Sequence, residues 1–413
     1  MKSGLYNILD LSIFFLGLFS FFPFIRAISF FNLLWAVLLM ILVLSIFLTR
    51  KRSIILKTSR FNFCIVIYII YTVGVSFLSG NLSIASRFIE LSQIPIFYLA
   101  FEHNRKLGRN MNNLRIIKLL SPFIILTSIL TLKEYRITPF ISRMIKSGAI
   151  EGKEIMASGV GGYEFIYFLV FLFSVLIFTF RSIDFGKHRK KSMLIMLLLT
   201  ILISYNIVLS GYTIALFLFV ISILFRLLDK TINLNKLIKT ISLFILLFIL
   251  FYLGYNFIID KFLVRFEGTG NASKILEIIS FFNSDTLGVS SQARVNVYLE
   301  SISIFINNPF FGIIFYPLAV NHSGELIAFG QHSQIIDTFA LFGISLGLLQ
   351  LYIYTKPLKD RITVGLKKYD VLAILIMFNF LVITVFNNIT PSIGFVVLFI
   401  YPTISEIRNK QKL

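Results

Sequence analysis

The chain has 413 residues, of which 57% are hydrophobic and 14% charged, and its mean hydropathy is +0.88. This composition excludes an ordinary soluble domain and indicates a polytopic membrane protein. The net charge of +20 is divided among many short segments, whereas nucleic-acid binding needs basic residues gathered on one soluble face.

Apolar runs of about 17 to 25 residues are typical of membrane-spanning helices. The sequence predicts twelve such runs, at 8–25, 28–48, 61–79, 84–101, 119–132, 163–180, 193–210, 212–226, 239–258, 333–354, 371–387 and 391–403. The expected fold class is therefore all-α: a single polytopic membrane domain over 1–413, built as a helical bundle of about 12 transmembrane helices.

The positive charges predict the orientation of these helices. With a cytoplasmic N-terminus, 28 of the 39 Lys and Arg residues fall in inside segments, at 2, 50–60, 105–118, 181–191, 226–239, 356–368 and 408–412. Cytoplasmic loops carry an excess of Lys and Arg, so both termini are expected inside.

Two longer segments, 133–162 and 259–331, are then expected outside. The second contains apolar residues at helical spacing over 293–306, with Arg294 in the first turn. Ser290 or Ser291 is a candidate cap, and Asn307-Asn308-Pro309 is expected to end this helix. An interfacial helix on the outer membrane surface is predicted.

Each outside segment ends in a polar sequence that leads into an apolar run. Ser158-Gly-Val-Gly-Gly162 precedes Glu164, and Gly330-Gln-His332-Ser333 precedes a run carrying Asp337. A helix N-terminus favours an anion such as phosphate. The alternative is that the glycines only let the chain turn sharply. Asp337 points to a different helical face from His332 and is expected to be a wall residue.

Arg87 and Glu90 lie one turn apart at the start of the fourth run, where they can pair with each other. Ionisable groups at this depth usually face a bundle interior or a wet cavity. Arg87 is therefore a second-tier candidate for phosphate binding, with structural pairing as the alternative.

The four histidines divide between the two sides. His103 and His188 lie among cations in inside segments and are expected to be solvated, whereas His322 and His332 lie outside. A set of His322, Glu325 and His332 matches no zinc spacing, and the chain has no Asp-x-Asp pair. Neither a metal nor another cofactor is expected.

A succession of motifs follows Arg294: Asn308-Pro309-Phe310-Phe311-Gly312, then His332-Ser333, then Gly343-x-x-x-Gly347. This succession resembles the C-terminal signature shared by O-antigen polymerases and O-antigen ligases, and the many-span plan with one large late outside loop is similar to that family too. The motifs cover about 290–350. Arg143 and Gly159 have a spacing found in some polymerases.

The resemblance implies a metal-independent glycosyltransferase in the bacterial cytoplasmic (inner) membrane, with its active site facing the outside or periplasm. A growing glycan would pass from undecaprenyl diphosphate to a lipid-linked repeat unit during O-antigen or capsule synthesis. The partners would be undecaprenyl-diphosphate-linked oligosaccharides and membrane lipid, with a chain-length regulator and a flippase as further candidates.

The residue chemistry fits this activity. Guanidinium groups bind phosphate oxygens in a planar two-point geometry, so Arg143, Arg265 and Arg294 are candidates for the diphosphate. His332 suits a general base, with Glu164 in reserve, although His332 can instead hydrogen-bond the diphosphate.

Two other functions stay open. An O-antigen ligase is the alternative within the family, but many ligases carry an Arg in the turn that here reads Ser210-Gly211-Tyr212-Thr213. A flippase or transporter of lipid-linked oligosaccharide would require charged residues at the membrane midplane, whereas the middles of these runs carry none.

Overall fold

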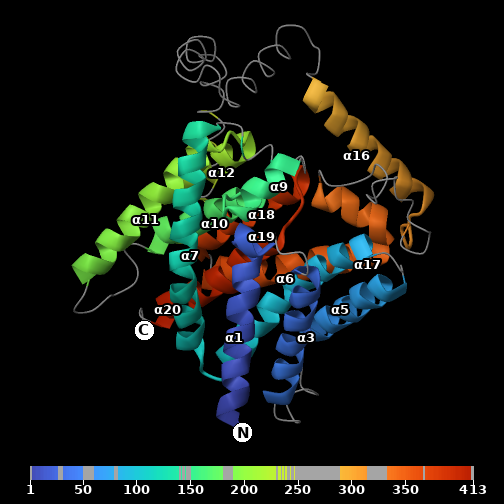
Figure 1. Cartoon of the computed structure of the whole chain (residues 1–413), viewed down its shortest axis with the longest axis horizontal. Helices are drawn as coiled ribbons and strands as arrows, with labels where there is room; N and C mark the ends of the chain where they lie inside the picture. The colour runs from blue at the N-terminus through green and yellow to red at the C-terminus, as the bar shows by residue number, and fades with distance from the viewer. Residues whose placement is uncertain are drawn as a thin grey trace.

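The computed structural model describes residues 2–26, 31–49, 60–78, 82–138, 141, 145, 150–179, 189–228, 231–233, 235–236, 238–239, 242, 246, 289–313, 333–365 and 368–410 (Figure 1). Its elements are, in chain order, α1 (Lys2–Phe21), α2 (Pro23–Arg26), α3 (Phe31–Thr49), α5 (Arg60–Leu78), α6 (Leu82–Lys106), α7 (Asn110–Ile137), α9 (Ile150–Ala157), α10 (Tyr163–Thr179), α11 (Arg189–Leu209), α12 (Thr213–Arg226), β1 (Thr231–Ile232), α16 (Val289–Asn307), α17 (Gln334–Ile362), β2 (Thr363–Gly365), β3 (Lys368–Asp370), α18 (Val371–Phe386), α19 (Pro391–Phe395), η2 (Val396–Ile400) and α20 (Tyr401–Lys410).

The predicted helical membrane fold is confirmed in its main feature. Four described helices are long and apolar enough to cross a membrane, within Gly4–Phe21, Asn110–Ile137, Ser192–Leu209 and Gln334–Ile362, and several shorter apolar helices accompany them. The ninth predicted run, 239–258, lies almost entirely outside the described residues.

Several helices are longer than their predicted apolar runs. The prediction of a short helix over 119–132 is wrong, because α7 extends from Asn110 to Ile137. Likewise α17 continues past the predicted end at 354 to Ile362. The added turns hold Lys, Arg and Glu, which are good helix formers, so hydropathy marks only the apolar middle of each helix.

The surface of α11 shows why the protein belongs in a membrane. Leu194, Leu198 and Ile201 are each more than half exposed although they lie in the middle of an apolar helix. Exposed apolar residues also follow one another along α3, at Leu33, Met40 and Leu44. A soluble protein rarely exposes apolar surface on this scale, so these faces contact lipid.

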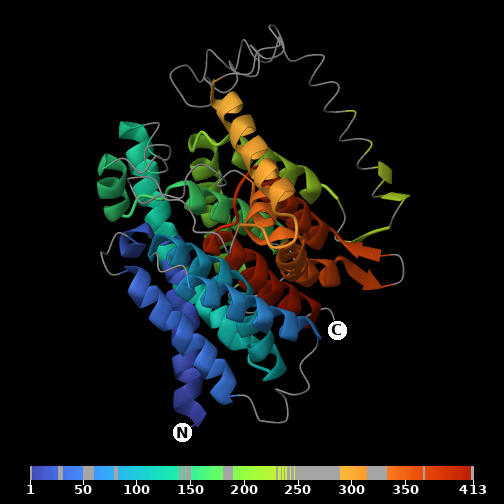
Figure 2. The same cartoon turned by 90° about the vertical axis from the view of Figure 1, so that its right-hand side faces the viewer.

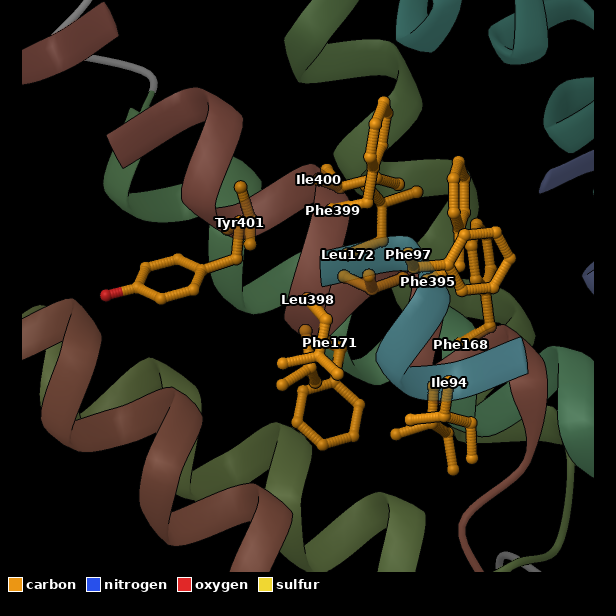
Figure 3. Packing of buried hydrophobic residues seen from close by; sticks show 14 of the residues in the cluster. Ile94, Phe97, Phe168, Phe171, Leu172, Phe395, Leu398, Phe399, Ile400 and Tyr401 are labelled. Carbon is orange, nitrogen blue, oxygen red and sulfur yellow. The ribbon is translucent and has the colours of Figure 1, made fainter. Parts of the chain in front are cut away.

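Around α10 lies the core of the bundle. This helix is apolar all round, and a helix of that kind is buried. Figure 3 shows Phe168 of α10, Phe97 of α6 and Phe395 of α19 within this core. The rings of Phe97 and Phe395 are 4.8 Å apart. The C-terminal helix α19–η2–α20 contains one π-helical segment, whose five residues are all buried.

Charged residues gather at one end of the bundle, which we call the basic end and define by Asp10, Arg109, Arg361, Asp370 and Arg408. Arg109 pairs with Asp10 at 2.6 Å, and Arg361 lies over the ring of Phe101 at 5.1 Å. Arg408 pairs with Asp370, and both side chains are almost fully buried. Burial lowers the pKa of the Arg408 guanidinium.

A three-stranded sheet in the order β1-β3-β2 also lies near the basic end, and an all-α prediction did not anticipate it. Thr231 pairs with Asp370 and Thr363 with Tyr369. Figure 2 shows β2 and β3 as a hairpin beyond the end of α17. Strand β1 and the hairpin come from two segments predicted to lie on the same side of the membrane.

The expectation that His103 is solvated is wrong. Its side chain is 4% exposed near the end of α6, where Nε2 lies 2.8 Å from the hydroxyl of Thr49. The surrounding Lys and Arg residues suggested a solvated loop, but α6 continues through this segment to Lys106.

In the middle of the bundle, a neutral polar cluster joins three helices. The hydroxyls of Ser174 (α10) and Ser222 (α12) are 2.8 Å apart, and Asn379 (α18) donates to them at 3.2 and 3.3 Å. All three residues are fully buried. Interhelical hydrogen bonds of this kind hold membrane helices together without placing a charge in hydrocarbon.

Candidate active site

Only part of the predicted site falls within the described structure. Arg143, Arg265, His322 and His332 lie outside the described residues, as do the glycines before His332. Arg87 and Arg294 lie on described helices, α6 and α16, but their side chains, and so any pairing of Arg87 with Glu90, are outside the description. Glu164 is half-buried in the first turn of α10.

The chain enters α10 through the predicted glycine-rich segment. Gly159 has a φ of 90°, and the amide of Gly161 donates to the hydroxyl of Thr131 on α7 at 2.8 Å. Because this amide already has a partner, it is not available to an anion. At Gly161 the structure therefore favours the alternative in which the glycines allow a close turn.

Ser333 begins α17 as its N-cap. Its hydroxyl accepts from the amide of Ile336 at 3.4 Å and donates to the carbonyl of Thr384 on α18 at 3.4 Å. The amide of Gln334 donates to the carbonyl of Asn387 at 3.1 Å. The first turn of α17 is thus held against the end of α18, directly after His332 in the chain.

The connection between α18 and α19 joins the beginnings of α10 and α17. At one end, the amide of Ile389 donates to Oε1 of Gln334 at 3.1 Å. At the other, the hydroxyl of Ser392 donates to the carbonyl of Glu164 at 3.2 Å. The two helix entrances that the sequence analysis singled out therefore meet at one end of the bundle, which we call the site end and define by Glu164, Ser333 and 387–392.

Three tyrosines add an aromatic cluster at the site end. The ring of Tyr163 lies 4.7 Å from that of Tyr167 and 5.5 Å from that of Tyr212. Asn387 donates to the hydroxyl of Tyr167 at 3.3 Å. Tyr163 and Tyr212 are half-buried and Tyr167 is buried. Tyrosine combines an apolar ring with a polar hydroxyl, which suits the boundary between an apolar core and a polar surface.

Neither this aromatic cluster nor the contribution of Asn387 was predicted from the sequence. A signal was present, because Tyr212 occupies the predicted tight turn after Gly211, which has a φ of 71°. Polar residues also separate the last two short apolar runs, at 387–392. Which helix entrances lie together could not be read from either signal.

The helix predicted over 293–306 is confirmed as α16, which spans Val289–Asn307. Ser290 and Ser291 lie inside its first turn, so the proposed caps are wrong, whereas the predicted end at Asn307 is correct. The helix lies beside the first half of α17 at the edge of the bundle (Figure 1). Phe305 and Phe339 pack with their ring centroids 5.5 Å apart.

A polar contact links the same two helices. The hydroxyl of Ser301 on α16 donates to Oδ1 of Asp337 on α17 at 3.2 Å. Ser301 is fully buried and Asp337 is 2% exposed. Asp337 was expected to be a wall residue on α17, and it is instead a hydrogen-bonded contact between the two helices.

The motif 308–312 packs into a break in α17. Gly343 has φ 64° and ψ −165°, which interrupts the helix. In an unbroken helix the amide of Ile344 would donate to the carbonyl of Ala340. Here Ile344 donates to Pro309 at 2.8 Å, and Ala340 accepts from Ile313 at 3.2 Å. The turn after α16 thus supplies partners for the amide of Ile344 and the carbonyl of Ala340, which would pair with each other in an unbroken helix.

No family model, curated protein or solved structure matches the chain. The helical fold and the exposed apolar surface together define a helical membrane protein. Its site end brings together Glu164, the residues that follow His332, and the helix that carries Arg294.

Proposed function

We propose that this protein is a polysaccharide repeat-unit polymerase. It would transfer a growing glycan from undecaprenyl diphosphate to a lipid-linked repeat unit at the outer face of the bacterial cytoplasmic membrane. One observation carries the proposal. The starts of α10 and α17 and the helix α16, which the sequence marks as candidate parts of the site, lie together although they are far apart in the chain. Ser392 hydrogen-bonds Glu164 of α10, and Ile389 hydrogen-bonds Gln334, the first residue of α17. Ser301 of α16 hydrogen-bonds Asp337 of α17.

A bundle of about twelve spans with both termini in the cytoplasm is part of the proposal. The basic end supports it, because residues from several segments predicted to be inside lie there together, including Arg109, Arg361 and Arg408. The concentration of Lys and Arg in these segments of the sequence is typical of the cytoplasmic side. The site end lies at the opposite ends of α7, α10, α17 and α18 and would face the outside.

In the proposed reaction a hydroxyl of the incoming repeat unit attacks the anomeric carbon of the growing glycan. A carbon–oxygen bond forms to that hydroxyl, and the bond to undecaprenyl diphosphate breaks, its electron pair leaving with the diphosphate. Attack from the opposite face inverts the anomeric configuration. His332 takes the hydroxyl proton, with Glu164 as the reserve base. Arg294, Arg143, Arg265 and the second-tier Arg87 stabilise the developing phosphate charge.

Two observations favour a polymerase over the alternatives. The turn after α11 carries Tyr212, whose ring packs on Tyr163, in the place where many ligases carry Arg. The buried cluster in the middle of the bundle, Ser174, Ser222 and Asn379, is neutral and internally hydrogen-bonded. A transporter that moves a charged diphosphate across the membrane needs charged groups at that level.

Deleting the gene tests the function in cells. A polymerase deletion leaves a single repeat unit at the surface in place of a ladder of chain lengths. Loss of even the single unit from the lipid A core points to a ligase, and an undiminished ladder rules out an essential polymerase role. Purified protein given only lipid-linked repeat units, with chelator present, should then produce the same ladder.

A further inference from the structure

The contact between Asp337 and Ser301 lies where α16 meets the first turn of α17. A carboxylate in a first helical turn is stabilised by the helix dipole, and the amide of Asp337 also donates to the carbonyl of Ser333 at 2.9 Å. Asp337 thus connects α16 to the residue that follows His332. Since both side chains are buried, the contact is protected from competing water.

The position of Arg294 on α16 makes this contact relevant to the proposed reaction. Residue 294 precedes Ser301 by seven residues in the same helix, which is close to two full turns. Residues at this spacing lie on the same side of a helix. The contact with Asp337 therefore sets the rotation of α16 that determines where residue 294 lies relative to α17.

A second contact fixes the other end of α16. The turn after Asn307 is hydrogen-bonded to α17 at its break: the amide of Ile313 donates to Ala340, and the amide of Ile344 donates to Pro309. The hydroxyl of Ser345 also donates to the carbonyl of Phe310 at 3.0 Å. This turn holds the end of α16 near Asn307, and Phe305 packs on Phe339 close to the same end. Asp337 adds a polar contact one turn nearer to residue 294, at the level of Ser301.

We propose that Asp337 is a positioning residue that holds α16, and with it Arg294, in register with the beginning of α17. This inference rests on the proposed function for its catalytic consequence. A misplacement of about 1 Å can reduce a rate about 100-fold, even when the changed residue is remote from the reacting atoms. Asp337 therefore acts on phosphate stabilisation through Arg294.

The kinetic test compares Asp337→Leu, which cannot accept the hydrogen bond, with Asp337→Asn, which keeps an oxygen at the same place. We expect Asp337→Leu to lower kcat about 10- to 100-fold with little change in KM, and Asp337→Asn to recover most of that loss. Glu300→Gln, at the neighbouring exposed carboxylate on α16, is the matched control.

Combining substitutions separates positioning from general damage. If Asp337 acts through Arg294, adding Asp337→Leu to Arg294→Lys should change the residual kcat less than about twofold. Independent effects would multiply, and that result overturns the proposal. Ser301→Ala removes the same hydrogen bond from the other side and serves if Asp337→Leu fails to fold.

A distance measurement tests the positioning without reference to activity. Spin labels at Ser303 on α16 and Leu348 on α17, both exposed, are placed in a Cys64→Ser background. We expect one narrow distance distribution in the parent and in Asp337→Asn, and a broader one in Asp337→Leu. An unchanged distribution in Asp337→Leu refutes the positioning role. Failure of the parent protein to make polymer refutes only the proposed function.

Discussion

Gly312 and Gly343 are matched across the contact between the 309–313 turn and α17. A β-carbon on Gly343 would overlap the backbone of Phe310, and one on Gly312 would overlap the backbone of Leu341. Both residues have a positive φ, of 62° and 64°. The two segments approach so closely that only glycine fits on either side.

Replacing Gly343 by alanine should therefore destabilise the protein more than its backbone angle alone requires. A positive φ costs a residue with a β-carbon about 1–2 kcal/mol, and overpacking adds about 1–3 kcal/mol. Gly108→Ala is the control, because Gly108 has a φ of 73° but open space around it. In detergent, the unfolding temperature of Gly343→Ala should lie well below that of Gly108→Ala. Equal unfolding temperatures would contradict the close approach.

The role proposed for Arg294 depends on the shape of its guanidinium group as well as its charge. Arg294→Lys keeps the charge but loses the planar two-point geometry, so polymer formation should fall nearly as far as in Arg294→Ala at equal protein level. Arg136→Lys, at an exposed position on α7, is the control. Full activity in Arg294→Lys would show that charge alone suffices.

Two variants distinguish a base from a phosphate ligand at His332. If His332 is the base, His332→Gln should lower turnover about 100- to 10,000-fold while substrate binding survives. If it only binds the diphosphate, His332→Gln should keep much of the activity and His332→Ala should mainly raise KM. If His332→Ala keeps nearly the turnover of the parent protein, Glu164 becomes the candidate base. Glu164→Gln then tests that role.

Stability should depend strongly on the pair between Arg408 and Asp370. Removing one member of a buried ion pair leaves an unpaired charge and costs about 3–5 kcal/mol, so Arg408→Ala should lower the unfolding temperature sharply. Lys356 and Asp360 form an exposed pair on α17, and Lys356→Ala should change that temperature within experimental error. Arg408 lies at the basic end, so kcat per folded molecule should stay near that of the parent protein.

Membrane orientation can be measured with reporter fusions placed between helices. Fusions after Leu107, Lys187 and Gly365 should report the cytoplasm, and fusions near Lys146 and Asn283 should report the outside. We expect this because Lys and Arg are concentrated in the segments around Leu107, Lys187 and Gly365, as is typical of cytoplasmic loops. An outside signal after Lys187 would overturn the orientation and place the site end in the cytoplasm.

Hydropathy located the described apolar helices because a helix that lies in lipid needs a long apolar run. It failed at their ends, as with α7, where Arg115 and Lys118 continue the helix beyond the apolar stretch. The helix α16 was predictable because Val295, Leu299 and Ile302 repeat at helical spacing. Its caps were not, because several polar residues near position 290 satisfy the same rule.

The components of the site were partly predictable, but their arrangement was not. Motifs marked Glu164 and the end of α16, whereas the contacts of Asn387 with Tyr167 and of Ser301 with Asp337 join residues distant in sequence. A single sequence contains no signal for such pairs. The break at Gly343 was also hidden, because glycine within an apolar run is compatible with a continuous membrane helix.

The broken turn of α17 has a consequence for how the protein is assembled during synthesis. A helix with an unpaired amide at Ile344 and an unpaired carbonyl at Ala340 enters hydrocarbon poorly, because each exposed group costs several kcal/mol there. The 309–313 turn precedes α17 in the chain and is therefore already synthesised when α17 emerges from the ribosome. The turn and the helix are expected to insert as one unit, whereas a chain that lacks the turn should close the break, with the amide of Ile344 donating to the carbonyl of Ala340 in a continuous helix.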